Sequence, residues 1–578
     1  MKNFIVSNNK NFWILNSGEL VFSTSFLEKD NLSFIEENKI KYSTQTAHLR
    51  KSVEEFIDDA EFVDVKYSKY LKILSRRLNK THNKSYSEEF WKKAFSLGLV
   101  RTITLLHEHF RIYQSNFDIN EHQFNLLNQS DFFIPKDFEE QRVFLNNNGI
   151  GNEQIFTHFV DCFYPQKTVE RIFLKNTNLS NNTFKSLIFE ILLKGKRFIK
   201  NINFKKPSTL LLGSYIQKDK KARIIKKSKN QIKEIFLYPK KSKKVHLDHR
   251  IKLSEYESNF DDFDKFFFTS IKYLIPKILI ENFKTYEKYF KEKLMEYDNL
   301  KSIICENFIS HSYNSLFLAF AKEEKNIIHL YNEHNCFSHI FTGLFSKYVE
   351  DLTDKYYTIG WHENRNKIIK SSSLFNFKVD LNKNPNVILF ITAPFFEKFN
   401  HYSTFFGCCN ERVDPSINFV DLFFKNIPKK LHGLIHYKGY PKSKLYKDRE
   451  DFYNYYHGKF KVLNPEIKAK SIMKNTKLLI VDYLSTGYLE GIISDIPTIV
   501  LFDSNVYSLN KEHNLFFKPL IDSGIFQRSP IEAANLLGKI HLNPKSWWES
   551  KKVSKGREDF LKNIDTSDLL IDQLLLQI

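Results

Sequence analysis

Short apolar runs separated by helix-length segments are the main pattern in the second half of the chain. Runs rich in Ile, Leu, Val and Phe are typical of strands covered on both faces, and helix-length spacers connect parallel strands. The pattern therefore predicts an α/β fold built from parallel βαβ units. The runs are SIICEN, NIIHLYNEH, NVILFITAPFF, HGLIHYKGYP, KLLIVDY and PTIVLFD.

The chain has 578 residues, more than one hydrophobic core usually contains, so two or more domains are expected. Residues 51–115 and 260–297 carry apolar residues at three- and four-residue spacing, which predicts helices in the N-terminal half. The character of the sequence changes within 345–375. We therefore expect an N-terminal α/β domain over 1–350 with helical and basic insertions, and a C-terminal α/β domain over 351–578 that ends in closing helices.

The net charge of +20 favours anionic partners, although exposed lysines alone also produce such a charge. The densest Lys/Arg run covers residues 217–250. It could contact an anionic membrane surface or another polyanion, or it could be a solvated insertion without a partner. Aromatic residues do not alternate through the run, which disfavours single-stranded nucleic acid as a partner.

The five cysteines form no CxxC pair, which is typical of a reduced, cytosolic environment. Cys408 and Cys409 are adjacent but lack a second cluster at zinc spacing, so we expect no metal site. Neither a signal peptide nor an apolar window long enough to cross a membrane is recognisable. These features predict a cytoplasmic protein whose contact with the inner membrane, if any, is peripheral.

The stretch VDYLSTGYLEGIISDIPTIVLFD, residues 481–503, places a polar turn between two predicted strands. Ligands of parallel sheets bind at such turns, where a helix N-terminus favours phosphate. Ser485 and Thr486 supply hydroxyl donors, and Gly487 lets a ligand approach the backbone. Glu490 lies one helical turn after Thr486, where it could accept hydrogen bonds from sugar hydroxyls. The alternative is that Ser485 only caps the helix.

A second polar group, in HLYNEHNCFSH at residues 329–339, follows another predicted strand. His334 stands beside Glu333 at the strand end and is a candidate general base, with a structural histidine as the alternative. The spacing of His329, His334 and His339 could also suit a metal, but nothing else in the sequence supports one.

Two further turns carry candidate residues. In LIHYKGYPK, Lys438 follows a predicted strand and could neutralise a nucleotide phosphate, or it could belong to a plain basic turn. Near the N-terminus, residues 4–6, 12–15 and 20–22 read as short strands. The motif ILNSGEL places Glu19 after the second of these strands, where it could face the acceptor and act as the base.

Several catalytic signatures are missing from the sequence. It contains no GxxxxGKS loop, no HExxH, no GxSxG and no convincing GxGxxG. P-loop phosphoryl transfer, zinc-protease chemistry, serine hydrolysis and hydride transfer therefore lack their usual residues. A DxD pair of metal-dependent glycosyltransferases is also missing as a clear motif at a strand end. We expect no cofactor.

The region from Ile496 to Ile564 resembles the C-terminal half of a family of bacterial transferases associated with surface-carbohydrate biosynthesis. ILNSGEL is similar to the family's N-terminal "lGEw" turn, EHNCF takes the place of a "QHGG"-type turn, and TIGW at 358–361 resembles "swGw". The most specific part of the resemblance is the C-terminal tail. Its matching residues are Pro497 to Ile499, Pro544, Trp547, Trp548, Val553, Arg557 and Phe560.

The resemblance implies a GT-B glycosyltransferase with two Rossmann-like domains. Relatives of this type include capsule transferases that use CMP-activated ulosonic sugars, in which a Ser/Thr-Gly turn and a helical Glu bind the nucleotide. The residues that match this pattern here are Ser485, Thr486, Gly487 and Glu490.

The chain departs from these relatives at two places. Asn335 and Cys336 replace the family's glycines, and Tyr440–Pro441 stands where CMP-sugar transferases carry His-Pro.

The sequence thus predicts a metal-independent glycosyltransferase that moves a sugar from a nucleotide-activated donor to a bacterial surface glycan or a lipid-linked acceptor. A CMP-ulosonic acid is the donor that the resemblance suggests. Two alternatives stay open. One is a transferase of CDP-linked polyol phosphate, and the other is a non-enzymatic scaffold that binds polyanions through residues 217–250.

Overall fold

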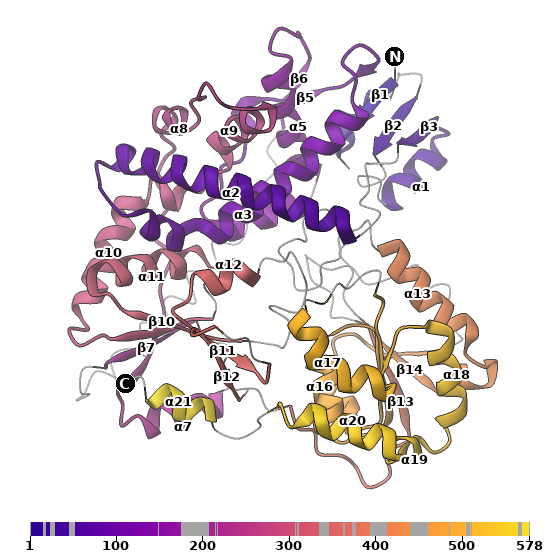
Figure 1. Cartoon of the computed structure of the whole chain (residues 1–578). Helices are drawn as coiled ribbons and strands as arrows, with labels where there is room; N and C mark the ends of the chain where they lie inside the picture. The colour runs from indigo at the N-terminus through magenta and orange to yellow at the C-terminus, as the bar shows by residue number, and fades with distance from the viewer. Residues whose placement is uncertain are drawn as a thin grey trace.

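In the part of the chain that it describes, a computed structural model contains four parallel sheets, two of them with six strands each. Figure 1 shows the four-stranded sheet and the two six-stranded sheets in three separate places, with long helices between them. The residues that the structure describes are 2–7, 9–15, 19–23, 29–45, 53–147, 149–174, 207–213, 216, 218–306, 308, 311–333, 346–361, 365–372, 377–392, 413–439, 460–484, 486–504, 509, 511–564 and 569–576.

The first sheet is small, with the strand order β3-β2-β1-β4 and every pair parallel. The expected strand at 12–15 is wrong: residues Lys10–Phe12 form a 3-10 helix that Asn9 caps. The indole of Trp13 donates to the carbonyl of Ser7, which folds this segment back onto β1. The elements here are β1 (Lys2–Ile5), β2 (Leu20–Ser23), α1 (Lys29–Glu37), β3 (Tyr42–Gln45) and β4 (His122–Gln123).

A helical layer follows, as the apolar spacing predicted. The hydroxyl of Ser87 accepts a hydrogen bond from the backbone of Phe90 and starts the second long helix. Asp264 accepts hydrogen bonds from Lys66 at 2.8 Å and Tyr70 at 2.7 Å, which ties α9 to α2. The elements are α2 (Val53–His82), α3 (Glu88–Asn116), β5 (Leu126–Leu127), α4 (Phe138–Asn147), α5 (Gly149–Phe163), β6 (Arg171–Ile172), α8 (Leu247–Leu253), α9 (Asp262–Leu274) and α10 (Phe283–Met295).

The first six-stranded sheet, called here the N-terminal sheet, has the order β12-β11-β10-β9-β7-β8 with all pairs parallel. In Figure 1, α7 and α21 lie on one side of it and α11 and α12 on the other. Its elements are β7 (Thr209–Leu212), α7 (Lys218–Lys227), β8 (Ile232–Ile235), β9 (Ser302–Ile304), α11 (Ser312–Lys325), β10 (Ile328–Asn332), α12 (Ser346–Asp351), β11 (Lys355–Ile359), β12 (Ile368–Ser371) and α21 (Leu569–Leu575).

This sheet differs from the expected organisation in two ways. The described part of the basic run forms α7, β8 and the start of α8, and β8 pairs with β7, so the run belongs to the sheet instead of forming an insertion. Strands β11 and β12 lie beyond the boundary expected at residue 350, because their pairing with β10 places them in this sheet. Strand pairing, which composition does not report, sets the extent of the sheet.

The second six-stranded sheet, the C-terminal sheet, has the order β15-β14-β13-β16-β17-β18. Numbered along the chain this is 3-2-1-4-5-6, the strand order of dinucleotide-binding Rossmann folds. Figure 1 shows α13 and α18 on one side and α16 and α17 on the other. The strands are β13 (Val387–Ile391), β14 (Ile435–Lys438), β15 (Lys461–Val462), β16 (Thr476–Val481), β17 (Thr498–Leu501) and β18 (Phe526–Gln527).

Apolar residues on both faces explain why these strands read as continuous apolar runs. Ile388 and Ile480 pack into one hydrophobic cluster, while Leu389 and Val481 pack into another. The predicted α/β class with two Rossmann-like sheets is therefore confirmed. The helices are α13 (Val413–Asn426), α15 (Ala469–Met473), α16 (Thr486–Ile493), α17 (Lys511–Ser523), α18 (Pro530–Ile540), α19 (Pro544–Trp548) and α20 (Lys551–Leu561).

The two six-stranded sheets are linked at the turn after β11. Gly360 has φ +87°, a conformation that favours glycine, and a Cβ there would stand 2.4 Å from the carbonyl oxygen of Asn563. The ring of Trp361 lies 4.8 Å from the ring of His513 on α17. The turn that resembles the family's "swGw" therefore joins the N-terminal sheet to helices that belong to the C-terminal half.

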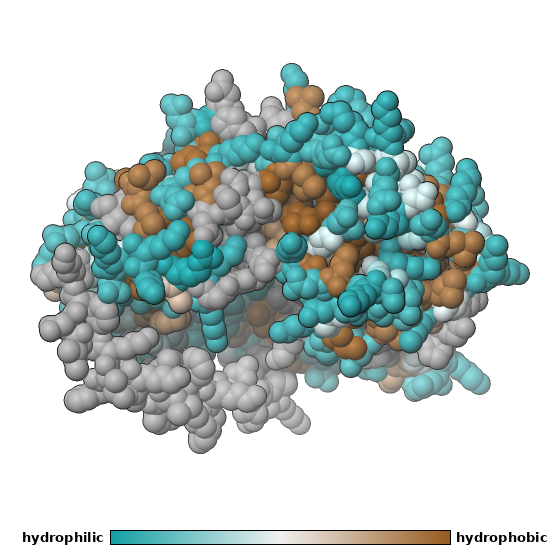
Figure 2. Space-filling view, turned by 90° about the horizontal axis from the view of Figure 1, so that it is seen from below, coloured by the Kyte–Doolittle hydropathy of each residue, from teal (hydrophilic) through white to brown (hydrophobic). Residues whose placement is uncertain are grey.

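The described surface carries both hydrophilic and apolar side chains (Figure 2). Figure 2 views the end of the molecule where the two larger sheets lie, and the described surface there is mostly hydrophilic, with apolar side chains in several separate groups. Scattered groups of this kind are ordinary on protein surfaces. Among the helices that the structure describes, none combines the length and the apolarity that a membrane span requires.

Candidate functional site at the switch point of the C-terminal sheet

The order of the C-terminal sheet reverses between β13 and β16. The chain builds β14 and β15 on one side of β13 and then returns to build β16, β17 and β18 on the other. Helices leave such neighbouring strands on opposite faces, so the carboxyl ends open a crevice in which α/β proteins bind ligands. The residues just beyond β13 and β16 therefore form the candidate ligand site.

Two polar side chains meet at this point. Thr392 follows β13 and Asp482 follows β16, and the Thr392 hydroxyl donates to Asp482 Oδ2 at 2.6 Å. Both residues are buried, with exposed fractions of 1% and 7%. A hydrogen-bonded carboxylate at a switch point can accept hydrogen bonds from a ligand as well. Neither residue is among the candidates predicted from the sequence, although each is the first polar residue after an apolar run.

Helix α16 starts directly above the switch point. A Cβ placed on Gly487 would lie 3.7 Å from Val481 and 4.0 Å from Ile391, which are the last residues of β16 and β13. Lower on the helix, a Cβ on Gly491 would lie 2.5 Å from the Thr498 hydroxyl oxygen. The helix therefore packs closely on the strands, and its N-terminus stands over the crevice.

The predicted ligand residues on this helix are partly brought together. Thr486 is the first residue of α16 and is half-buried, and Ser485 lies outside the described residues. Glu490 has an ion pair with Lys470 of α15, with 3.4 Å between Nζ and Oε1. Burial raises the pKa of Glu490, and the nearby Lys470 acts in the opposite direction. A carboxylate therefore stands one turn below the helix N-terminus, as predicted, with a lysine beside it.

Lys438, predicted to neutralise a nucleotide phosphate, donates to two backbone carbonyls in the structure. It ends β14 and is buried, and its ammonium donates to the carbonyl of Gly439 at 3.0 Å and to that of Pro465 at 2.9 Å. Two of its three N–H groups thus hold the backbone of the neighbouring loops. Because β14 adjoins β13, Lys438 still lies next to the switch point, and the backbone of Thr392 donates to its carbonyl at 3.2 Å.

The candidate base His334 lies outside the described residues, but its neighbours are placed. Glu333 accepts hydrogen bonds from the backbone of Ile359 at 3.0 Å and from the indole of Trp361 at 2.8 Å. It thereby holds the turn that links the two sheets. His329 places its ring nitrogens 3.1 Å from the carbonyls of Leu352 and Cys305, and burial lowers its pKa to about 4. This histidine is part of the core.

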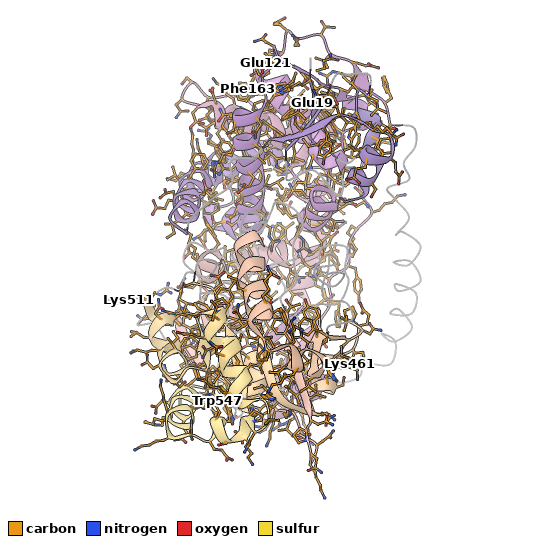
Figure 3. All side chains as sticks on the ribbon, turned by 90° about the vertical axis from the view of Figure 1, so that its right-hand side faces the viewer. Glu19, Glu121, Phe163, Lys461, Lys511 and Trp547 are labelled. Atoms are coloured by element: carbon orange, nitrogen blue, oxygen red, sulfur yellow. The ribbon has the colours of Figure 1, made fainter. Side chains whose placement is uncertain are left out.

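The other candidate base, Glu19, lies on the small sheet. Because residues 10–12 form a 3-10 helix, Glu19 does not follow a strand; it precedes β2, and its carbonyl accepts from Asn3 of β1. Its carboxylate lies 3.9 Å from Lys2. Figure 3 labels Glu19 at the upper end of the molecule, whereas Lys461 and Lys511 of the C-terminal half lie in the lower part. The structure does not bring Glu19 to the switch point of the C-terminal sheet.

Within the described ranges, no group of three or more His, Cys, Asp or Glu residues is placed to hold a metal ion. Of the three histidines spaced as if for a metal, His329 uses its ring nitrogens on backbone carbonyls. The other two, His334 and His339, lie outside these ranges. Cys408 and Cys409 also lie outside them.

Comparisons with solved structures find only weak likenesses. MurG of Acinetobacter baumannii is 11% identical, with a TM-score of 0.35, over 64% of this chain and 100% of that chain. A glycosyltransferase of Rickettsia africae is 11% identical, with a TM-score of 0.34, over 65% and 98% of the two chains. The wall teichoic acid polymerase TagF is 10% identical, with a TM-score of 0.29, over 69% and 99%.

The sequence comparisons give a clearer result. No curated protein shows significant similarity to the chain. The family model described as LIC12162 family transferase, however, matches residues 2–577. The match includes the small N-terminal sheet, the helical layer and both six-stranded sheets. The chain therefore belongs to the LIC12162 family of transferases.

Proposed function

We propose that the protein is a glycosyltransferase that moves a sugar from a nucleotide-activated donor to a bacterial surface glycan or a lipid-linked acceptor. The observation that carries the proposal is the switch point of the C-terminal sheet, where the buried pair Thr392–Asp482 lies beside the N-terminus of α16. Membership of a transferase family supports a group-transfer reaction. The resemblance to capsule transferases supports a CMP-linked ulosonic acid as donor.

Each part of this site has a task in the transfer. The first N–H groups of α16 have no partner within the helix and carry its positive dipole end, so they favour the departing nucleotide phosphate. Ser485 and Thr486 add hydroxyl donors to it. Gly487 lies in the first turn of α16, where the absence of a side chain lets a ligand approach the backbone, and Glu490 accepts hydrogen bonds from the hydroxyls of a sugar. Stabilising the charge on the leaving phosphate lowers the barrier to transfer.

Lys438 and the candidate bases have separate roles in this proposal. Lys438 shapes the loops around the nucleotide through its two carbonyl contacts. His334 directly follows Glu333 and lies outside the described residues, so its role as the base stays a prediction from the sequence. Glu19 would require an acceptor that extends to the small sheet.

Thermal unfolding in the presence of CMP, CDP, UDP and GDP tests the donor site. A nucleotide present at one hundred times its Kd stabilises the fold by about 2.7 kcal/mol, so one base should give the largest shift. Glu490→Gln and Thr486→Val should each weaken that shift. Glu532→Gln, an exposed site on α18, should leave it unchanged. Wild-type affinity in both site variants, or no shift with any nucleotide, would contradict the proposal. A preference for CDP would instead favour a CDP-linked donor.

We also propose a peripheral contact with anionic lipid at the end of the basic run. Leu247 and Ile251 lie four residues apart on α8 and are 50% and 47% exposed, so they form one apolar edge. Lys243 and Lys244 are exposed just before the helix. Apolar side chains flanked by lysines suit the interface of an anionic bilayer, where the lysines meet headgroups and the apolar groups enter.

Co-sedimentation with phosphatidylglycerol vesicles tests this contact. The protein should bind them at low salt, bind phosphatidylcholine vesicles poorly, and detach as salt screens the charges. The double variant Leu247→Ser with Ile251→Ser should lose most of the binding. Leu542→Ser removes an equally apolar side chain, 81% exposed, from the C-terminal half and should have no effect. Equal binding by both variants, or binding to nucleic acid instead of vesicles, would refute the contact.

A further inference from the structure

A row of buried polar side chains crosses three neighbouring strands of the N-terminal sheet. Glu306 follows β9, Asn332 ends β10 and Tyr357 lies on β11, and their exposed fractions are 1%, 2% and 1%. Asn332 and Tyr357 are register partners. Ile304 and Leu330 are also register partners. Glu306 lies two residues after Ile304, and Asn332 lies two residues after Leu330. The three residues therefore occupy adjacent positions across the sheet, with Asn332 and Glu306 at the carboxyl ends of their strands and Tyr357 in the middle of β11.

Two members of the row have unused hydrogen-bonding groups. Within the described part of the chain, neither Oδ1 nor Nδ2 of Asn332 has a hydrogen-bond partner, and the same holds for the hydroxyl of Tyr357. Leaving a buried polar group unpaired destabilises a fold, and folded proteins pair nearly all such groups. Burial raises the pKa of Tyr357 to about 12, so its hydroxyl stays protonated and can donate. A ligand with several hydroxyl groups would satisfy these donors and acceptors together.

The row also stands at the place where this sheet would bind a ligand. The order β8-β7-β9-β10 reverses between β7 and β9, so the switch point of the N-terminal sheet lies there. Glu306 comes directly after β9 at this point. Across from it, Gly213 follows β7 with φ +58° and has no side chain to fill the space. Each six-stranded sheet thus has a buried carboxylate beside its own switch point, Asp482 in one and Glu306 in the other.

The chemistry of the row fits a carbohydrate better than an anion. A carboxylate, a carboxamide and a phenol offer acceptors and donors of the kind that sugar hydroxyls use. The row contains no cation that would bind a phosphate or a carboxylate group of a ligand. The site at α16 already provides for the nucleotide, so this second site is available for the molecule that receives the sugar.

We propose that Glu306 is the general base of the transfer and that Asn332 and Tyr357 bind neighbouring hydroxyls of the acceptor. This inference rests on the proposed glycosyltransferase function. Glu306 removes the proton from the acceptor hydroxyl as its oxygen forms a bond to the anomeric carbon of the donor. The bond from that carbon to the nucleotide phosphate oxygen breaks, and the nucleotide leaves with the electron pair. The proton stays on Glu306 and passes to solvent afterwards.

The base is tested with Glu306→Gln, which keeps the size of the side chain. Turnover is measured as nucleotide release from the nucleotide sugar that stabilises the protein most, with methyl glycosides as acceptors. A base acts only when deprotonated, so the wild-type rate should fall at low pH, where the base is protonated. The variant should lose about 10²- to 10⁴-fold in kcat and should no longer show this fall. Its affinity for the nucleotide should stay at the wild-type value.

Asn332→Leu gives a readout that does not require turnover. Leucine has a similar size and removes two unpaired polar groups, so the variant should unfold at a higher temperature than the wild type. Its KM for the acceptor should rise while its nucleotide affinity is unchanged. A gain in stability together with a loss of acceptor binding is typical of a residue kept for function. If a buried water or the fold itself used the Asn332 amide, leucine would lower the unfolding temperature, and that result overturns the proposal.

Glu333→Gln is the matched control at the same edge of the sheet. It weakens the bonds to Ile359 and Trp361, so it should lower stability while the fall of rate at low pH remains. If Glu306→Gln binds the nucleotide normally and keeps the wild-type rate and pH profile, Glu306 is not the base. The proposed glycosyltransferase function would not be affected by that result. If the wild type binds no nucleotide, the proposed function fails, and the unfolding temperature of Asn332→Leu still decides whether the row is a ligand site.

Discussion

At the scale of single residues, Gly487 and Gly491 stand one helical turn apart on α16 in different surroundings. A Cβ on Gly491 would meet the Thr498 hydroxyl at 2.5 Å and Leu479 at 2.7 Å, both closer than real Cβ atoms approach. A Cβ on Gly487 would meet its nearest neighbours at 3.7 Å and 4.0 Å, which is ordinary contact. Gly491 is therefore required for the close packing of the helix on the sheet, whereas the position of Gly487 could hold a side chain in ordinary contact with Val481 and Ile391.

The two glycines should therefore respond differently to alanine. Gly491→Ala should cost about 1–3 kcal/mol of unfolding free energy, because the methyl group forces α16 away from the strands. Gly487→Ala should keep or raise stability, since alanine is favoured over glycine in helices by up to about 1 kcal/mol. It should nevertheless weaken nucleotide binding if the ligand approaches the backbone of the first turn, because the methyl group hinders that approach. Urea unfolding and nucleotide titration of both variants separate these effects. Equal destabilisation by the two would contradict this description of the helix.

At the scale of elements, the sequence predicts those parts of the site that are local. The apolar runs of β16 and β17 and the polar turn between them identify α16 and place Thr486 and Glu490 on it. The pairing of Thr392 with Asp482 is not local, since the two residues are 90 positions apart and meet only because β13 and β16 are neighbours. Strand order follows from packing choices that a single run does not contain. Glu306, Asn332 and Tyr357 are also brought together only by the order of the strands, so the sequence does not predict their proximity.

Two further differences have local physical causes. The segment FWIL reads as a strand by composition, yet Asn9 caps a 3-10 turn there and the Trp13 indole bonds to the carbonyl of Ser7. Lys438 reads as a phosphate ligand at a strand end, yet the carbonyl of Pro465 reaches its ammonium from a later loop. In both cases a side chain finds a backbone partner at hand, and composition does not show which partner is within reach.

At the scale of the whole molecule, the last described helix joins the two halves. Helix α21 follows the C-terminal helices in sequence but packs on the N-terminal sheet, where Leu570, Ile571 and Leu574 share a hydrophobic cluster with Leu211 and other strand residues. The backbone N–H of Leu570, the second residue of α21, donates to the hydroxyl of Ser372 at 2.9 Å, just past β12. The chain thus crosses between the halves twice, once after β12 and once before α21. Both crossings should limit how far the two ligand sites can move apart.

The stability of the N-terminal sheet should consequently depend on a residue at the far end of the sequence. Leu574 is 1% exposed, and Leu574→Ala should lower the unfolding free energy by about 2–5 kcal/mol through lost burial and the remaining cavity. Leu576, two residues later, is 82% exposed, so Leu576→Ala should change it by less than about 0.5 kcal/mol. Urea unfolding measures both.

The nucleotide provides an internal check on the same variant, because its proposed site lies on the other sheet. Nucleotide affinity should be unchanged in Leu574→Ala at temperatures where the protein is folded, whereas acceptor turnover should fall as the N-terminal sheet loosens. A variant as stable as Leu576→Ala would show that α21 does not hold the sheet. A variant that loses nucleotide affinity while folded would show that the two halves are coupled more tightly than two chain crossings require.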